Sequence, residues 1–314
     1  MHHIVFLDRD SLLANVRPPA FEHSWTDYPS TTADQVVERL RGATICVTNK
    51  VPVRDEHMAQ LPDLKMIAVA ATGTDNVDLA AARARGIVVA NIRNYSLGAV
   101  PEHAFALMLA LRRNLIAYRA DVEAGKWQAS PRFCLLDHPI RDLSGSTLGI
   151  VGYGALGQAV ARIGRAFGMK IIVTSRSPVS DPEVRQVPLD ELLRESDVVS
   201  LHAPLTEATR HMIGAAELQA MKRSAILINT ARGGLVDEQA LADALRAGVI
   251  AAAGFDVLSK EPPAPDNPLL TLRLPNFLLT PHNAWGSAQA MQTLADMLVD
   301  NIDAYAAGHP TNVV

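Results

Sequence analysis

Short apolar runs separated by amphipathic stretches recur along the chain, and this alternation predicts strands joined by helices. Four runs in the first part of the chain predict strands at residues 3–7, 43–48, 65–70 and 86–90. A second series predicts strands at residues 147–151, 170–174, 197–201, 225–229, 251–255 and 277–280. The first series indicates a small α/β domain, and the six strands of the second fit a doubly wound sheet.

Two further stretches have helical patterns that bear on domain organisation. Residues 101–119 are largely apolar and begin with proline, which predicts a helix between the domains, although the same pattern fits a buried core helix. Residues 287–308 predict an amphipathic helix that can pack on the open face of the first domain. The first domain is then discontinuous, with residues 1–98 and 286–314 enclosing a second domain of residues 99–285.

The junction after residue 151, in the segment LGIVGYGALGQAVA, is typical of a site for a pyrophosphate. Gly152 allows a tight turn, Gly154 allows close approach to the phosphates, and Gly157 allows the helix to pack on the strand. Free backbone N–H groups at the helix start bind anions. The predicted dinucleotide loop comprises Gly152, Tyr153, Gly154, Ala155, Leu156 and Gly157.

The end of the next strand bears on the choice of dinucleotide. An NAD-preferring site usually has an acidic residue there, whereas this chain has Ser175, Arg176 and Ser177. A guanidinium flanked by two hydroxyls offers hydrogen bonds to a 2′-phosphate. The sequence therefore favours NADP and leaves NAD open, and the alternative is that Arg176 is an ordinary solvated arginine.

Composition excludes several classes of function. The 314 residues are 48% hydrophobic with a net charge of −4, and no basic stripe of the kind a nucleic-acid-binding protein needs is present. No apolar run has the length of about 18 residues that a membrane span requires, and charged residues follow the N-terminus too soon for a signal peptide, so we expect a cytoplasmic protein. Cys46 and Cys134 are the only cysteines, and no CxxC motif or Cys/His cluster is present, so we expect inert core thiols with no disulfide framework and no metal site.

Three polar residues follow strands of the second series: Arg232, Glu261 and His282. A guanidinium can bind a carboxylate through two hydrogen bonds, and an imidazole can transfer a proton near neutral pH. A carboxylate beside that imidazole favours its protonated form. Each residue alone is more often structural, but their order after a dinucleotide motif indicates catalysis.

At this point the chain resembles the D-isomer-specific 2-hydroxyacid dehydrogenases over nearly its whole length. The segments that carry the resemblance are LGIVGYGALGQAVA, LHAPLTEATRHMI, LINTARGGLVDEQAL, AAGFDVLSKEPP, LLTPHNAWGS and, in the first domain, ATGTDNVDL. Asn283 and Pro101 depart from the usual aliphatic residue and alanine, and neither change removes a catalytic group. The resemblance implies two Rossmann-like doubly wound α/β domains, with the dinucleotide-binding domain inserted into a discontinuous flavodoxin-like substrate domain.

The resemblance also implies a role for each site residue. Arg232 would anchor the carboxylate and keto oxygen of the substrate, His282 would be the acid/base, and Glu261 its partner. Asp256 would contact the nicotinamide carboxamide. Thr72, Gly73 and Thr74 would help to bind the substrate carboxylate, and a homodimer would form around residues 101–119 and Trp127. Further cofactor contacts would come from His202, Ala203, Pro204, Thr230, Ala231 and His282.

The expected reaction is hydride transfer between a nicotinamide and a small 2-oxo acid, with domain closure excluding water. Residues 133–154 and the pair Ala284–Trp285 look most like hydroxypyruvate reductases, so hydroxypyruvate and glyoxylate are the favoured substrates. A dehydrogenase for a bulkier D-2-hydroxy acid and a dinucleotide-sensing corepressor or scaffold remain alternatives. Formate oxidation would replace Glu261 with glutamine.

Overall fold

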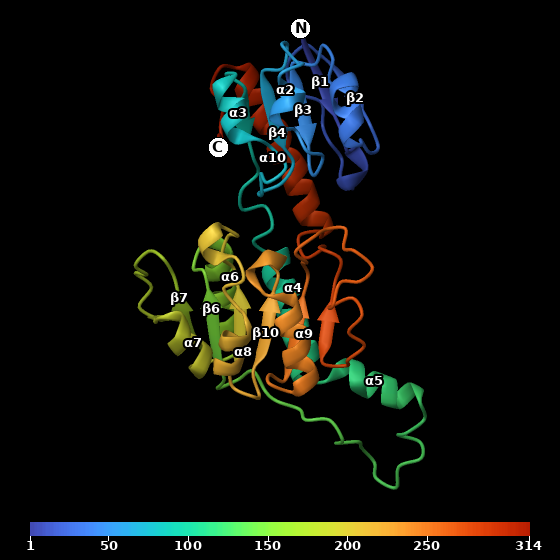
Figure 1. The fold of residues 1–314 in the computed structure, drawn as a ribbon, viewed down its shortest axis with the longest axis vertical. Helices are drawn as coiled ribbons and strands as arrows, with labels where there is room; N and C mark the ends of the chain where they lie inside the picture. The colour runs from blue at the N-terminus through green and yellow to red at the C-terminus, as the bar shows by residue number, and fades with distance from the viewer. The chain divides into compact units, whose positions relative to one another are not determined.

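The computed structural model describes residues 1–314 and divides the chain into two compact units (Figure 1). The discontinuous unit consists of Met1–Ser96 and Gly286–Val314, and the inserted unit of Leu97–Trp285. The first crossing between the units therefore falls after Ser96, where the sequence suggested residue 98.

The discontinuous unit is a parallel five-stranded sheet in the order β2-β1-β3-β4-β5. This is the flavodoxin-like strand order. The strands are β1 (His2–Phe6), β2 (His23–Asp27), β3 (Ile45–Thr48), β4 (Met66–Val69) and β5 (Val88–Ala90). The short helices are η1 (Arg9–Ser11), η2 (Ala33–Gln35), α1 (Val36–Arg39), α2 (Asp55–Met58) and α3 (Leu79–Ala84).

The sequence did not predict β2. Its residues, HSWTD, contain no apolar run, and four of them are half-buried while the fifth is exposed. Because β2 is an edge strand paired only with β1, it needs no fully buried face. Edge strands of this kind lack the continuous apolar signal of the central strands.

The last helix, α10 (Ala288–Ala306), packs against β4 of the discontinuous unit, as predicted. The Ser287 hydroxyl caps its first turn by accepting a hydrogen bond from the Ala290 N–H at 3.1 Å. Arg17 forms ion pairs with Asp300 and Asp303 on its outer face.

The inserted unit is a parallel seven-stranded sheet in the order β12-β11-β10-β9-β6-β7-β8. Counted from its first strand, this is the 3-2-1-4-5-6 order of a dinucleotide-binding fold with one strand added. The strands are β6 (Thr147–Val151), β7 (Lys170–Thr174), β8 (Arg185–Gln186), β9 (Val198–Leu201), β10 (Ile226–Asn229), β11 (Ala252–Phe255) and β12 (Phe277–Leu279). The remaining helices are α4 (Ala99–Arg112), α5 (Leu115–Glu123), α6 (Ala155–Ala166), α7 (Leu189–Glu195), η3 (Glu207–Thr209), α8 (Ala215–Ala220), η4 (Gly233–Leu235) and α9 (Glu238–Ala247).

Successive residues of the central strands face opposite cores, as in a doubly wound sheet. Ile226 and Ile228 lie in the apolar cluster that includes α4 and α6, whereas Leu227 lies in the cluster that includes α7, α8 and α9. Both faces of the sheet are therefore covered, which explains the continuous apolar runs that predicted its strands. The exception is the exposed two-residue edge strand β8, which the sequence did not predict.

The single helix predicted over residues 101–119 is wrong in two respects. The chain breaks between α4 and α5 because Asn114 has a left-handed backbone with φ of 50°. In addition, α4 packs on β10 and β11, and its buried residues belong to the core of the inserted unit rather than to a linker. The alternative interpretation, a buried core helix, is the correct one for α4.

Cys46 is buried in β3, but Cys134 is only half-buried in the segment that follows α5, so the expectation of a core thiol is wrong for Cys134. No helix of the structure has both the length and the apolar character needed to cross a bilayer.

Candidate functional site

Two of the three motif glycines are fixed by the turn between β6 and α6. Gly152 has φ of 94°, and a Cβ there would lie 2.6 Å from the His202 carbonyl oxygen. A Cβ on Gly157 would lie 2.2 Å from the Gly152 carbonyl oxygen. Any larger residue at these positions would displace backbone, so both glycines are needed to bring α6 against β6.

Gly154 differs, since a Cβ there would meet no atom within 4 Å. Gly154 is the N-cap of α6 and supplies no side-chain cap, which leaves the first N–H groups of the helix without a partner from that residue. Open space in front of a helix N-terminus is what a pyrophosphate requires. The residues present therefore fit a dinucleotide, with Tyr153, Ala155 and Leu156 completing the loop.

At the end of β7, Arg176 and Ser177 are exposed and Ser175 is half-buried. The Arg176 guanidinium forms no ion pair within the protein. This arrangement leaves a positive charge exposed beside the dinucleotide loop, and the predicted contact of Arg176 with a 2′-phosphate stays a prediction.

The predicted residues after β9 and β10 lie at the same carboxyl edge of the sheet, because the two strands are parallel neighbours. His202 Nε2 is 2.8 Å from the Ser200 hydroxyl, and desolvation by the surrounding protein lowers the pKa of His202 to about 4. Its imidazole is therefore neutral at physiological pH. Ala203 and Pro204 continue the loop after His202.

Thr230, which follows β10, has a buried hydroxyl without a hydrogen-bond partner in the protein. Since buried polar atoms are nearly always paired, this hydroxyl indicates a ligand at the sheet edge. The next residue, Ala231, donates its N–H to Asn229 Oδ1 at 3.1 Å and leads directly to Arg232.

Arg232 is held at the start of η4 by bonds to its own loop. Its Nη1 donates to the Ala231 carbonyl at 2.7 Å, and Asn229 Nδ2 donates to the Arg232 carbonyl at 2.9 Å. A Cβ on Gly233 would lie 1.9 Å from the Leu258 carbonyl carbon. The Arg232 loop therefore lies directly against the segment that leads to Glu261.

Glu261 and His282 lie in hydrogen-bond contact, as expected from the sequence. Glu261 Oε2 lies 2.5 Å from His282 Nδ1, and the Leu258 N–H donates to Glu261 Oε1 at 2.9 Å. Both side chains are partly exposed, at 35% and 26% of their surface. With Nδ1 directed at the carboxylate, His282 Nε2 lies on the far side of the ring, where a protonated imidazole can donate.

The His282 loop has an unusual backbone that other groups hold in place. His282 has φ of 52°, and the Trp285 indole donates to its carbonyl at 3.0 Å. Asp256, only 1% exposed, accepts the N–H groups of Asn283 at 3.0 Å and Ala284 at 2.9 Å. Asp256 therefore fixes the loop that carries His282.

Two residues of this network were missed by the sequence analysis. The Thr280 hydroxyl donates to Asp256 Oδ1 at 2.5 Å, and His103 Nε2 lies 2.9 Å from that hydroxyl. His103 is 177 residues away along the chain. A single histidine in an apolar helix carries no signal that could have identified this contact.

In the discontinuous unit, Thr72, Gly73 and Thr74 follow β4. The Thr72 hydroxyl donates to the Ile92 carbonyl and the Asn91 amide donates to the Thr72 carbonyl, both at 2.7 Å. The backbone N–H groups of Gly73 and Thr74 donate to no acceptor in the structure. They are therefore available to a carboxylate, and their predicted role stays a prediction.

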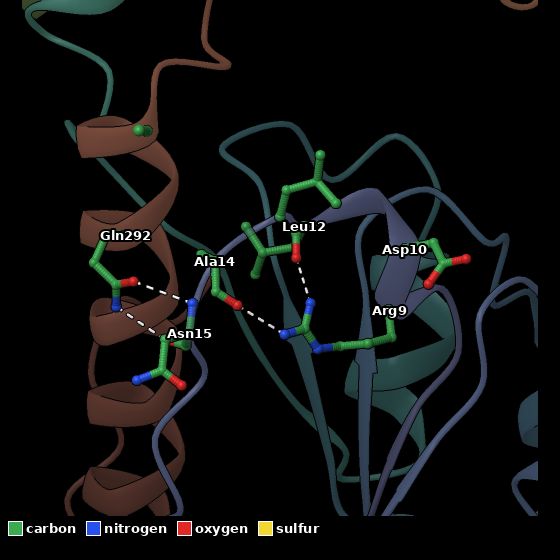
Figure 2. A pocket seen from close by; sticks show the side chains of 8 residues that line it. Arg9, Asp10, Leu12, Ala14, Asn15 and Gln292 are labelled. Carbon is green, nitrogen blue, oxygen red and sulfur yellow. Dashed lines mark hydrogen bonds between the residues drawn. The ribbon is translucent and has the colours of Figure 1, made fainter.

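The discontinuous unit also has a surface hollow of about 700 Å³ beside the start of α10 (Figure 2). The Arg9 guanidinium points into the loop there and donates to the carbonyls of Leu12 and Ala14, while the Gln292 amide bonds the backbone of Asn15. None of the predicted site residues lines this hollow. Its one arginine holds backbone rather than facing a ligand, so we do not assign the site there.

Comparison with known proteins agrees with this geometry. Residues 105–284 match the family described as D-isomer specific 2-hydroxyacid dehydrogenase, NAD binding domain. The chain is 55% identical over 312 residues to a glycerate dehydrogenase of Methylorubrum extorquens, covering 99% of this chain and 98% of that protein. It is 39% identical to a hydroxypyruvate reductase of Blautia hydrogenotrophica, covering 90% and 88% of the two chains. Among solved structures, an acyclic imino acid reductase in complex with NADPH and D-Arg is similar at a TM-score of 0.86, with 29% identity over 99% of both chains.

Proposed function

Because the chain belongs to the D-isomer specific 2-hydroxyacid dehydrogenases, we propose that it reduces hydroxypyruvate and glyoxylate with NADPH, giving D-glycerate and glycolate. The observation that carries the proposal is the pair of His282 and Glu261 beside the Arg232 loop, at the sheet edge that also carries the dinucleotide turn. The substrate class is supported by the glycerate dehydrogenase and hydroxypyruvate reductase among the relatives.

When bound, the reduced nicotinamide supplies a hydride to the carbonyl carbon of the 2-oxo acid. Arg232 binds the substrate carboxylate and stabilises charge on the reacting oxygen. His282 donates the proton on Nε2 to that oxygen, and Glu261 holds the imidazole in place through its contact with Nδ1. The loop of Thr72, Gly73 and Thr74 offers backbone N–H groups that would suit a carboxylate, and Asp256 keeps the His282 loop in place by accepting the N–H groups of Asn283 and Ala284.

The preference for NADP rests on Arg176. No carboxylate stands at the end of β7, and the exposed guanidinium is flanked by the hydroxyls of Ser175 and Ser177. A 2′-phosphate can accept charge-assisted hydrogen bonds from this group, whereas the 2′-hydroxyl of NAD gains less.

A second copy of the chain is the proposed protein partner. Seven large apolar side chains between residues 115 and 140 are exposed, and α5 with the loop after it extends from the sheet of the inserted unit (Figure 1). Such a patch is typical of an interface between subunits. The exposed residues are Leu115, Ile116, Val122, Trp127, Phe133, Leu136 and Ile140. Because the buried residues of α4 pack within the inserted unit, we place the proposed interface on α5 and the loop around Trp127, which keeps only the end of the predicted range 101–119.

Residues 115–140, which carry these apolar side chains, are held by polar contacts among themselves, so the proposed interface does not need a partner in order to form. Asp121 accepts bonds from Lys126 and His138, and the Tyr118 hydroxyl donates to the His138 carbonyl at 2.7 Å. Light scattering after size exclusion is expected to give a dimer for the native protein. A monomeric native protein would contradict this partner.

The proposed reaction is tested by steady-state oxidation of NADPH and NADH with hydroxypyruvate, glyoxylate, pyruvate and a phenyl-substituted 2-oxo acid. We expect the highest kcat/KM with NADPH and the first two acids. Preference for the phenyl-substituted acid would overturn the substrate proposal but keep the family. Tight NADPH binding without turnover on any acid would favour the corepressor alternative.

A further inference from the structure

The loop that carries Arg176 is held by one side chain that the sequence analysis did not single out. Gln186, in the two-residue strand β8, donates from Nε2 to the carbonyls of Ser175 at 2.9 Å and Ser177 at 3.1 Å. Its Oε1 accepts the Val179 N–H at 3.0 Å. Every polar atom of this amide is thus used on the residues that flank Arg176.

The far end of the same loop is tied to the dinucleotide turn. The Tyr153 hydroxyl donates to Asp181 Oδ2 at 2.7 Å, and Arg165 Nη1 lies 3.2 Å from the same oxygen. These contacts, the hydrogen bond from Tyr153 foremost, hold the pKa of Asp181 below its usual range. The carboxylate therefore stays charged, and the loop is anchored both at β8 and at the residue between Gly152 and Gly154.

Arg176 itself forms no ion pair in the protein, so the loop backbone sets the position from which its guanidinium reaches a ligand. We propose that Gln186 is a positioning residue for cofactor selection: it fixes the backbone of residues 175–179 so that Arg176 and the two serine hydroxyls meet a 2′-phosphate. This inference rests on the proposed preference for NADP. The proposed preference for NADP depends on the charge of Arg176, and the inference adds Gln186 as the residue that positions Arg176.

Local structure argues against a purely architectural role for Gln186. The residue is exposed, and β8 pairs only Ile172 with Arg185 and Val173 with Gln186. Gln186 belongs to neither apolar cluster of the inserted unit, so we expect the seven-stranded sheet to form without its side chain. Arg185, its neighbour, instead forms ion pairs with Glu191 and Glu195 and provides a matched control on the same strand.

The test replaces the amide with an apolar side chain of similar length, Gln186→Met. We expect the dissociation constant for adenosine 2′,5′-bisphosphate to rise about tenfold by calorimetry, and that for 5′-AMP to change less than about twofold. Hydrogen exchange at the Val179 amide is expected to accelerate in the variant. Arg185→Gln is expected to leave both dissociation constants and the Val179 exchange rate unchanged.

The dissociation constants of the native protein and its variants distinguish the role of Gln186 from the preference for NADP on which that role rests. If the native protein binds the two probes equally, the preference for NADP and the role of Gln186 both fail. If Arg176→Ala removes a measured preference but Gln186→Met keeps it, or weakens both probes equally, only the role of Gln186 is overturned. Should Gln186→Met fail to fold, Gln186→Glu keeps the acceptor for Val179 but loses both donors, and a preserved preference in that variant would equally overturn the inference.

Discussion

The dinucleotide turn and the His282 loop lie at the same edge of one sheet, yet they are held in opposite ways. The dinucleotide turn keeps its shape because side chains are absent, since a Cβ on Gly152 or Gly157 would overlap backbone. The His282 loop keeps its shape because a buried carboxylate, Asp256, binds two of its backbone N–H groups. The steric constraint is marked in the sequence by the glycines themselves, even though the atom that a Cβ on Gly152 would meet belongs to His202, whereas nothing in the sequence marks which N–H groups Asp256 accepts. The first kind of constraint is visible in a sequence, and the second emerges only from the fold.

The largest expected effect comes from replacing His282, the proposed proton donor. His282→Ala removes the imidazole, so turnover of hydroxypyruvate is expected to fall by at least about 10³-fold, a scale that proton transfer by a side chain supports. NADPH binding, measured by fluorescence titration, is expected to survive, because the dinucleotide turn is untouched. Turnover near the native rate would remove His282 from the mechanism.

Alanine substitutions at Gly157 and at Gly154 are expected to have different effects. Gly157→Ala forces a Cβ against the Gly152 carbonyl, and we expect a loss of about 3 kcal/mol in the free energy of unfolding by urea denaturation. Gly154→Ala meets open space and is expected to keep native stability while weakening NADPH binding. Equal stability of the two variants would show that the Gly157 contact does not constrain the turn.

Asp256→Asn tests the hydrogen bonds that hold the His282 loop. One amide oxygen cannot replace two carboxylate oxygens, so one of the Asn283 and Ala284 N–H groups loses its acceptor, and the amide nitrogen faces a donor. We expect kcat to fall about 10- to 100-fold, with the dissociation constant for NADPH changed less than about threefold. The exposed Asp266→Asn serves as the matched control, and an unchanged kcat in Asp256→Asn would contradict the positioning role.

Glu261→Gln is expected to weaken the support of the His282 ring. A neutral amide replaces the carboxylate that contacts Nδ1, so a charge-assisted hydrogen bond is lost. We expect kcat with hydroxypyruvate to fall about tenfold while the dissociation constant for NADPH stays unchanged. An unchanged kcat in the variant would show that Glu261 does not assist His282.

The smallest expected effect concerns stability at low pH. The pKa of His202 is about 4 in the folded protein and near 6.5 in the unfolded chain, so only the unfolded chain takes up this proton between those values. This histidine therefore lowers stability as pH falls from about 7 towards 4. His202→Gln is expected to show a smaller drop in Tm between about pH 7 and pH 5 than the native protein, and an equal drop would contradict the neutral imidazole.

Burial also explains which strands and helices could be predicted from the sequence. The central strands were predicted because burial on both faces makes them continuously apolar, whereas β2 and β8 were missed because they are partly or wholly exposed edges. The break at Asn114 was missed because no glycine or proline marks it.

The residues of the candidate site likewise fall into those that local sequence predicted and those that only tertiary structure reveals. Gly152, Gly157 and the Arg176 position follow from local chemistry, and the pairing of Glu261 with His282 followed from the order of the motifs together with the resemblance. The support from Thr280, His103 and Gln186 could not be predicted. Each contributes a single hydrogen-bonding side chain whose partner is set by tertiary structure.

The most direct test of the central claim is analysis of the products after mixing the native protein with NADPH and hydroxypyruvate. We expect equal amounts of NADP and glycerate, with the glycerate in the D form. NADPH that binds but is not consumed, or glycerate of the L form, would contradict it.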